Sequence, residues 1–241
     1  MKLLALDSSG LVASVAVAED DNLIGEYTVN YKKTHSQTLL PMLDVVAKMI
    51  ELDLETIDAI AVAKGPGSFT GLRIGSATAK GLGLALDKPI VEIPTVDGLA
   101  YNLWGAKDLV CPIMDARRNQ TYTGIYAFEN GEMQVLEPQC AVDIAQIVDK
   151  INELQRPVVF LGDGVPVFRD YLSEHLRVSY SFAPAHLNKQ RAAAVAALAF
   201  RYLNNGHIVR AEEHQPDYLR LSQAERERKE KDARLPGDAG V

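Results

Sequence analysis

The stretch that decides the fold is Lys64-Gly-Pro-Gly-Ser-Phe-Thr-Gly-Leu-Arg-Ile-Gly-Ser-Ala-Thr-Ala-Lys-Gly-Leu-Gly-Leu-Ala-Leu86. Its glycine- and proline-rich start is typical of a turn, and Ser68 then has the side chain of a helix N-cap. Small residues recur every four positions in the predicted helix and therefore share one face: Gly71, Gly75, Ala79 and Gly83. Because each glycine inside a helix costs about 1 kcal/mol relative to alanine, the stripe indicates that another part of the structure packs closely against it.

Three interpretations of this stretch compete. The glycine-rich start is suited to cradling a phosphate at a helix N-terminus, although no Gly-Lys-Ser/Thr follows, so it is not a Walker loop. A membrane dimerisation face is rejected because Arg73 and Lys80 interrupt the apolar run. We favour a helix–helix contact, either within the fold or with another subunit, with part of the stripe packed against a sheet.

The composition is that of an ordinary globular protein. With 241 residues, 47% of them hydrophobic and 24% charged, the chain suits one large domain or two small ones. A net charge of −7 argues against the chain alone as a strong binder of nucleic acid, since phosphate contacts need a basic surface. A local basic patch, or a complex in which another subunit binds the nucleic acid, stays open.

Neither the cysteines nor the chain ends indicate secretion or a membrane. Cys111 and Cys140 form no Cys-x-x-Cys, which indicates reduced thiols rather than a redox pair or zinc knuckle. The N-terminal apolar run is too short for a signal peptide, and no segment reaches transmembrane length. We therefore expect a cytoplasmic protein with no membrane contact.

The hydrophobic pattern predicts the same series of elements twice. In the first half, three strands precede a helix, a strand, the striped helix and a strand, over 2–7, 12–18, 23–31, 39–50, 57–63, 69–86 and 89–94. Thr34 and Gln37 have the spacing of a capping box before the first helix. In the second half the elements fall at 110–115, 121–128, 133–136, 142–154, 157–161, 165–176, 178–181 and 188–203. We expect a first lobe at 1–105, a second at 106–220, and a charged, frayed or disordered tail at 221–241.

This doubled β-β-β-α-β-α order, with Asp7-Ser8-Ser9 on the first hairpin, resembles the actin, hexokinase and Hsp70 class of ATPase folds. The resemblance implies an α/β fold of two actin-like (ribonuclease H-like) lobes, each a mixed sheet with flanking helices. Within that class the chain resembles the bacterial TsaB family of tRNA threonylcarbamoyladenosine biosynthesis proteins, over roughly residues 1 to 220. The matching stretches are 4–9, 35–41, 65–75 (Gly-Pro-Gly-Ser-Phe-Thr-Gly-Leu-Arg-Ile-Gly), 114–118 (Met-Asp-Ala-Arg-Arg) and 216–220.

The resemblance implies a partner subunit rather than a self-sufficient enzyme. TsaB proteins support the catalytic relative TsaD, which transfers a threonylcarbamoyl group to N6 of the adenosine adjacent to the tRNA anticodon. The small ATPase TsaE joins them. We therefore expect TsaD-type and TsaE-type partners, a homodimer, tRNA contact through the complex, and no cofactor bound by this chain alone. ATP, Mg²⁺ and metal are then expected in the partner subunits.

The residues themselves predict no catalytic group and no metal site. The His-x-x-x-His pair of the catalytic relative corresponds by element order to Thr95 and Leu99, neither of which binds metals. His35 stands alone at a helix start, where a capping or packing role is the commoner one. In the ATPase class, Asp7 would hold a metal-bound water near phosphates. We favour instead a strand-end aspartate that bonds its own turn, because the second hairpin, 115–119, lacks the glycines that let backbone amides reach phosphates.

Two sets of residues are candidate sites. A vestigial phosphate-binding, nucleotide-binding or ionic cluster is predicted at Asp7, Ser8, Ser9, Asp115, Arg117 and Arg118. Its two arginines have three open roles: filling the cleft or pairing with Asp115 or Asp7, binding a phosphate, or binding the tRNA backbone. A partner interface is predicted where a small-residue groove meets an apolar ridge, at Leu39, Met42, Leu43, Val46, Gly71, Ile74, Gly75, Thr78, Ala79 and Leu82.

Two functions from different classes follow. In the first, the chain is a non-catalytic scaffold, and Gly75→Leu or Ala79→Arg should abolish association while the monomer stays folded. In the second, the chain is an independent actin-like ATPase or phosphotransferase, whose Mg-ATP turnover would be sensitive to Asp7→Ala. The glycine-free second turn and the lack of an evident catalytic base favour the scaffold.

Overall fold

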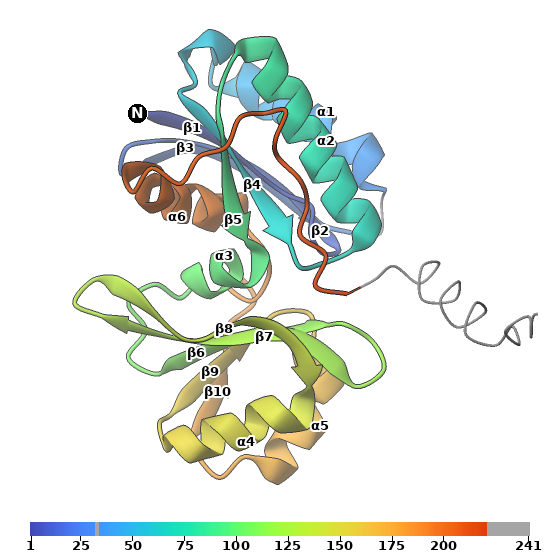
Figure 1. The fold of residues 1–241 in the computed structure, drawn as a ribbon, viewed down its shortest axis with the longest axis vertical. Helices are drawn as coiled ribbons and strands as arrows, with labels where there is room; N and C mark the ends of the chain where they lie inside the picture. The colour runs from blue at the N-terminus through green and yellow to red at the C-terminus, as the bar shows by residue number, and fades with distance from the viewer. Residues whose placement is uncertain (32–33, 221–241) are drawn as a thin grey trace, which may run out of the picture.

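The first lobe is built on a five-stranded mixed sheet in the order β3-β2-β1-β4-β5 (Figure 1). This computed structural model describes residues 1–31 and 34–220, so the predicted tail at 221–241 lies outside the described residues. The strands are β1 (Lys2–Asp7), β2 (Val12–Glu19), β3 (Asn22–Asn30), β4 (Ala59–Gly65) and β5 (Ile90–Pro94). The first three pair antiparallel, whereas β4 pairs parallel with both β1 and β5.

The second lobe repeats this topology in the order β8-β7-β6-β9-β10. Its strands are β6 (Leu109–Asp115), β7 (Gln120–Glu129), β8 (Glu132–Asp143), β9 (Val158–Leu161) and β10 (Tyr180–Phe182). Strand β8 continues well past the predicted 133–136 because it pairs with β7 along most of its length, across two irregularities in register. Two helices, α4 (Ile144–Leu154) and α5 (Val165–His175), pack on this sheet (Figure 1). The repeated topology confirms the predicted pair of actin-like lobes.

Helices cover both faces of the first sheet. On one face lie α1 (His35–Met49) and α2 (Phe69–Leu86) side by side; the chain between them forms a 3-10 turn, η1 (Leu54–Thr56), and then β4 (Figure 1). On the other face lies α6 (Ala192–Asn204), and the short helix α3 (Thr95–Tyr101) contacts both α6 and the second lobe. No helix among the described residues is long and apolar enough to cross a bilayer.

The boundary between the lobes differs from the predicted 106–220 second lobe. Helix α6 packs on β1 and β2, and the segment that follows it returns to the edge of the same sheet, where Val209 and Ile90 exchange backbone hydrogen bonds. The reason is steric: the face of the sheet under α6 is lined largely by alanine, and an alanine-rich helix fits closely against it. Residues 192–220 therefore belong structurally to the first lobe.

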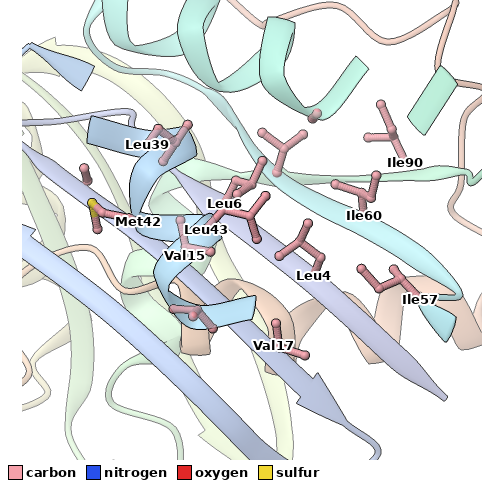
Figure 2. Packing of buried hydrophobic residues seen from close by; sticks show 14 of the residues in the cluster. Leu4, Leu6, Val15, Val17, Leu39, Met42, Leu43, Ile57, Ile60 and Ile90 are labelled. Carbon is pink, nitrogen blue, oxygen red and sulfur yellow. The ribbon is translucent and has the colours of Figure 1, made fainter. Parts of the chain in front are cut away.

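Side chains of the central strands alternate strictly between these two layers. Leu4 and Leu6 of β1 point toward α1 and α2 together with Val15 and Val17 of β2 (Figure 2). Their neighbours Leu3, Ala5, Ala16 and Ala18 point toward α6. The side chains under α1 and α2 are thus mostly bulky, and those under α6 are mostly alanine.

The two predicted helix starts have different outcomes. Ser68 caps α2 as predicted, since its Oγ accepts a hydrogen bond from Gly71 N at 3.3 Å. At α1, Thr34 is the N-cap residue but its side chain makes no capping bond, so the predicted capping box is not formed. Pro41 lies inside α1, where its missing N–H removes one hydrogen bond of the helix.

We expect the Leu6→Ala substitution to lower the free energy of unfolding by about 2–5 kcal/mol, because it leaves a cavity among fully buried side chains. The matched control is Leu11→Ala, at a side chain that is 62% exposed, which should change stability by less than about 0.5 kcal/mol. Urea denaturation measures both values. Similar losses in the two variants would contradict the described core.

Candidate functional site

The glycine stripe of α2 is explained by contact with the turn that follows β1. Ser8 Oγ donates a hydrogen bond to Gly71 O at 2.8 Å, and Ser68 N donates to Ser9 O at 2.7 Å. A Cβ added to Gly71 would lie 2.1 Å from Ser8 O, and one added to Gly75 would lie 2.6 Å from Ser8 Oγ. Only glycine permits so close an approach, so the stripe is an internal packing surface.

Most of the predicted interface residues are consequently inside the first lobe. On α1, Leu39, Met42, Leu43 and Val46 are buried in the core, and on α2 so are Gly71, Gly75 and Ala79. Ile74, Thr78 and Leu82 are partly buried. Sequence periodicity identified the apolar face of each helix correctly, but that face covers the sheet. The proposed Gly75→Leu and Ala79→Arg variants would therefore disrupt the lobe itself.

What α1 and α2 expose is a second apolar set, here called the outer stripe. On α1 it comprises Leu40, Val45 and Met49, of which Met49 is 80% exposed, and on α2 it comprises Ala77, Gly81 and Leu84. A groove of about 410 Å³ adjoins it between β3 and α1, lined by Tyr27, Val29, Tyr31, Gln37, Thr38, Pro41, Met42 and Val45. The sequence signal for the outer stripe is helical spacing, because Val45 and Met49 lie four positions apart and therefore share the side of α1 that faces away from the core.

The carboxylate of Asp7 bonds the turn that directly follows it. This carboxylate is buried, and Oδ1 accepts hydrogen bonds from Ser9 N at 2.9 Å and from Ser9 Oγ at 2.6 Å. Burial raises the pKa of Asp7, while the two bonds from Ser9 oppose that rise. His35 lies next to this turn, with Nε2 at 2.7 Å from Gly10 O. The geometry is that of a strand-end aspartate bonding its turn.

The corresponding turn of the second lobe has an unusual backbone. Arg117, Arg118 and Asn119 all adopt left-handed conformations, with φ of 63°, 57° and 60°. Asp115 Oδ1 accepts a hydrogen bond from Arg117 N at 2.7 Å. Neither arginine side chain forms an ion pair with Asp115 or Asp7 within the described residues, so this one of the roles left open by the sequence is not formed here. No hydrogen bond or ion pair in residues 1–31 and 34–220 joins the two halves of the predicted cluster.

A buried carboxyl group links the two lobes. Asp97 of α3 accepts a hydrogen bond from Tyr126 of β7 at 2.7 Å, and Tyr202 of α6 lies 3.4 Å from its other oxygen. Burial raises the pKa of Asp97, and the two tyrosine hydroxyls oppose that rise. Burial also raises the pKa of Tyr126, so the phenol stays a hydrogen-bond donor. This contact fixes the first lobe against the second.

A second buried chain of polar groups fastens the C-terminal segment, residues 205–220, across α2 and β5. Ser76 Oγ lies 2.7 Å from Nε2 of His214, whose Nδ1 lies 2.6 Å from Glu92 Oε1, and Lys64 pairs with the other carboxylate oxygen at 3.2 Å. Hydrogen bonding from His214 lowers the pKa of Glu92. The connectivity is that of a serine hydrolase triad. However, Ser76 and His214 are 5% and 1% exposed, so no substrate reaches the hydroxyl and the chain acts as a clamp.

The doubled sheet topology, the buried Asp97 contact between the lobes and the glycine-lined contact after β1 define a two-lobed protein of the actin-like ATPase fold class. Residues 22–228 match the family model described as TsaD: tRNA N6-adenosine threonylcarbamoyltransferase. The tRNA threonylcarbamoyladenosine biosynthesis protein TsaB of Bacillus subtilis is 33% identical over 93% of this chain and 96% of its own length. That of Escherichia coli is 29% identical, over 91% and 95%. The structure of YeaZ from Pseudomonas aeruginosa superimposes with a TM-score of 0.76 at 27% identity, covering 90% of this chain and 99% of that one.

The chain belongs to the TsaB family of tRNA threonylcarbamoyladenosine biosynthesis proteins. The sequence-based identification of the family is thereby confirmed. Among the described residues, no cluster of three or more histidine, cysteine, aspartate or glutamate side chains is placed to hold a metal ion.

The His214→Ala substitution should lower the free energy of unfolding by about 1–3 kcal/mol, because it leaves Ser76 Oγ and Glu92 without their buried partner. His186 is exposed, and His186→Ala serves as the control that should leave stability nearly unchanged. Thermal and urea unfolding report the difference. Equal stability of the two variants would mean that the clamp does not stabilise the fold.

The contribution of Asp97 to the free energy of unfolding should decrease as the pH rises. Because its pKa is raised above the ordinary value of 3.8, the folded protein keeps a proton that the unfolded chain releases as the pH rises above about 4. Asp97→Asn removes this titration while keeping one acceptor for Tyr126. We expect the stability difference between the parent and the variant to shift in favour of the variant from pH 4 to pH 7, measured by urea unfolding. A shift in the opposite direction would contradict the buried, proton-retaining carboxyl.

Proposed function

We propose that this chain is a non-catalytic scaffold subunit in tRNA threonylcarbamoyladenosine synthesis. It supports a TsaD-type transferase, together with a TsaE-type ATPase, in adding the threonylcarbamoyl group to N6 of the adenosine adjacent to the anticodon. The observation that carries the proposal is the outer stripe, an apolar surface that two neighbouring helices expose to solvent. Such a surface is typical of a protein–protein contact.

The geometry after β1 supports the non-catalytic part of the proposal. An actin-like ATPase needs a free carboxylate at the position of Asp7 and backbone amides in the second turn that reach the phosphates. In this chain Asp7 Oδ1 already accepts two hydrogen bonds from Ser9, and the amide of Arg117 already donates to Asp115 Oδ1. We therefore assign ATP, Mg²⁺ and any metal to the partner subunits, and we place the protein in the cytoplasm with its tRNA.

The outer stripe suits two alternative uses of one surface. Leu40, Val45 and Met49 form a ridge on α1, and the small residues of α2 leave a shallow strip beside it. A surface of this kind on one protomer is able to pack against its own copy about a two-fold axis. In our proposal the transferase, which shares the fold, replaces the second copy. Self-association and transferase binding then compete.

The Met49→Glu and Leu84→Glu substitutions should each weaken both associations about 30-fold or more, because a carboxylate would be buried in an apolar contact. Both side chains are exposed in the monomer, so its stability should be retained. Light scattering gives the self-association, and titration calorimetry with the transferase gives the second affinity.

The matched control is Val167→Glu, at an exposed valine on α5 of the second lobe. It should leave both affinities unchanged. If the outer-stripe variants dimerise and bind the transferase as tightly as this control does, the interface lies elsewhere. Steady Mg-ATP turnover by the lone chain, lost in Asp7→Ala, would instead favour the independent ATPase.

A further inference from the structure

Four arginines gather where the two lobes meet, and none of them forms an ion pair with a carboxylate in the described part of the chain. Arg73 lies on α2, Arg117 and Arg118 lie in the turn between β6 and β7, and Arg220 ends the described C-terminal segment. The ion pairs that are formed involve other cations. On a chain with a net charge of −7, this is a local concentration of unneutralised positive charge.

The C-terminal segment connects Arg73 on α2 with the turn that carries Arg117 and Arg118. Arg73 Nε donates a hydrogen bond to Tyr218 OH at 3.3 Å, and its guanidinium lies 4.1 Å from the centre of the Phe69 ring. The rings of Phe69 and Tyr218 are 4.7 Å apart. Two residues beyond Tyr218, Arg220 donates a hydrogen bond to Ala116 O, next to Arg117. We call this set the arginine surface: Phe69, Arg73, Arg117, Arg118, Tyr218 and Arg220.

The turn that presents Arg117 and Arg118 is held in its left-handed conformation from several sides. Ala116 N donates to Gln120 O, Gln120 N donates to Arg117 O, and Ile144 N donates to Asn119 O. Left-handed backbone is unfavourable for residues with a Cβ, so the turn persists because these bonds fix it. Its amides at Arg117 and Gln120 are already satisfied. The side chains that it presents to a ligand are those of Arg117 and Arg118, both of which are exposed.

We propose that the arginine surface contacts the phosphodiester backbone of RNA. Guanidinium groups pair with phosphate oxygens through two parallel hydrogen bonds, and the exposed ring of Tyr218 is a platform on which an unpaired base is able to stack. A free nucleotide is a poorer fit, since it needs a concave site with amides aimed at its phosphates. The identity of the RNA as tRNA rests on the proposed function, whereas the contact itself rests on these residues.

The acidic groups around the surface determine how strong this contact is. Asp115 is exposed beside the turn, and Asp163, whose pKa is raised by burial, accepts a hydrogen bond from Asp115 N at 3.2 Å. Asp217 precedes Tyr218 in the C-terminal segment. These carboxylates weaken the local positive potential. RNA binding by the lone chain is therefore weak, steeply salt-dependent, and an addition to the affinity of the whole complex.

The test is fluorescence anisotropy with a labelled anticodon stem-loop RNA between 25 and 200 mM salt, using the lone chain and its mixture with the transferase. In the double variant Arg117→Gln/Arg118→Gln, the slope of log affinity against log salt should fall in magnitude by about 1.4–1.8, as expected for two lost phosphate contacts. The affinity at low salt should fall about tenfold or more. Thermal unfolding checks that the variant stays folded.

The matched control is Arg156→Gln/Arg177→Gln, which removes the same charge from the second lobe away from the arginine surface. It should leave the slope unchanged. The proposal is overturned if both double variants show the same slope, if neither the chain nor the mixture binds the RNA, or if Arg117→Gln/Arg118→Gln lowers only the affinity for the transferase or for Mg-ATP. Loss of transferase binding by the outer-stripe variants, measured separately, decides the proposed function independently of this result.

Discussion

The structure of the first lobe depends on how closely the backbone of α2 approaches the turn after β1. With glycine at positions 67, 71 and 75, the helix comes within hydrogen-bond distance of Ser8 and Ser9, where any Cβ would collide. This contact fixes the start of α2 against β1 and leaves Asp7 buried with only its own turn to bond. The glycine-rich start of α2, which resembles a phosphate site in the sequence, is thereby used for packing. The opposite side of α2 remains exposed to solvent.

The C-terminal segment is the second constraint, because it connects elements that are far apart in the sequence. After α6 it adds a bridge to the edge of β5, passes over α2 with His214 clamped between Ser76 and Glu92, and ends at the turn of the second lobe (Figure 1). Each bond on this path has a sequence separation above 100 residues. The segment and the Asp97 contact together hold the relative position of the two lobes, which in turn places the arginine surface on both.

The sequence predicted the strands, the doubled topology and the Ser68 cap, because period-two and helical patterns and cap chemistry are local signals. It did not predict which partner an apolar face meets: Leu39 and Val46 have the same spacing whether they cover a sheet or a second subunit. The return of α6 to the first lobe, the Ser76–His214–Glu92 clamp and the left-handed turn at Arg117 depend on contacts between distant residues, for which a single sequence carries no periodic signal. Of these features, only the outer stripe could be predicted from the sequence, because its residues lie on the sides of the two helices that face away from the buried sides.

The central claim, a scaffold rather than a catalyst, is tested most directly by reconstituting tRNA modification with the transferase, the ATPase and the threonylcarbamoyl donor. The quantity measured is threonylcarbamoyladenosine per tRNA, by mass spectrometry, as this chain is titrated in. A scaffold predicts that the rate rises with added chain and saturates only at amounts stoichiometric with the transferase. Full activity without the chain, or saturation at a small catalytic fraction of the transferase, would contradict the account.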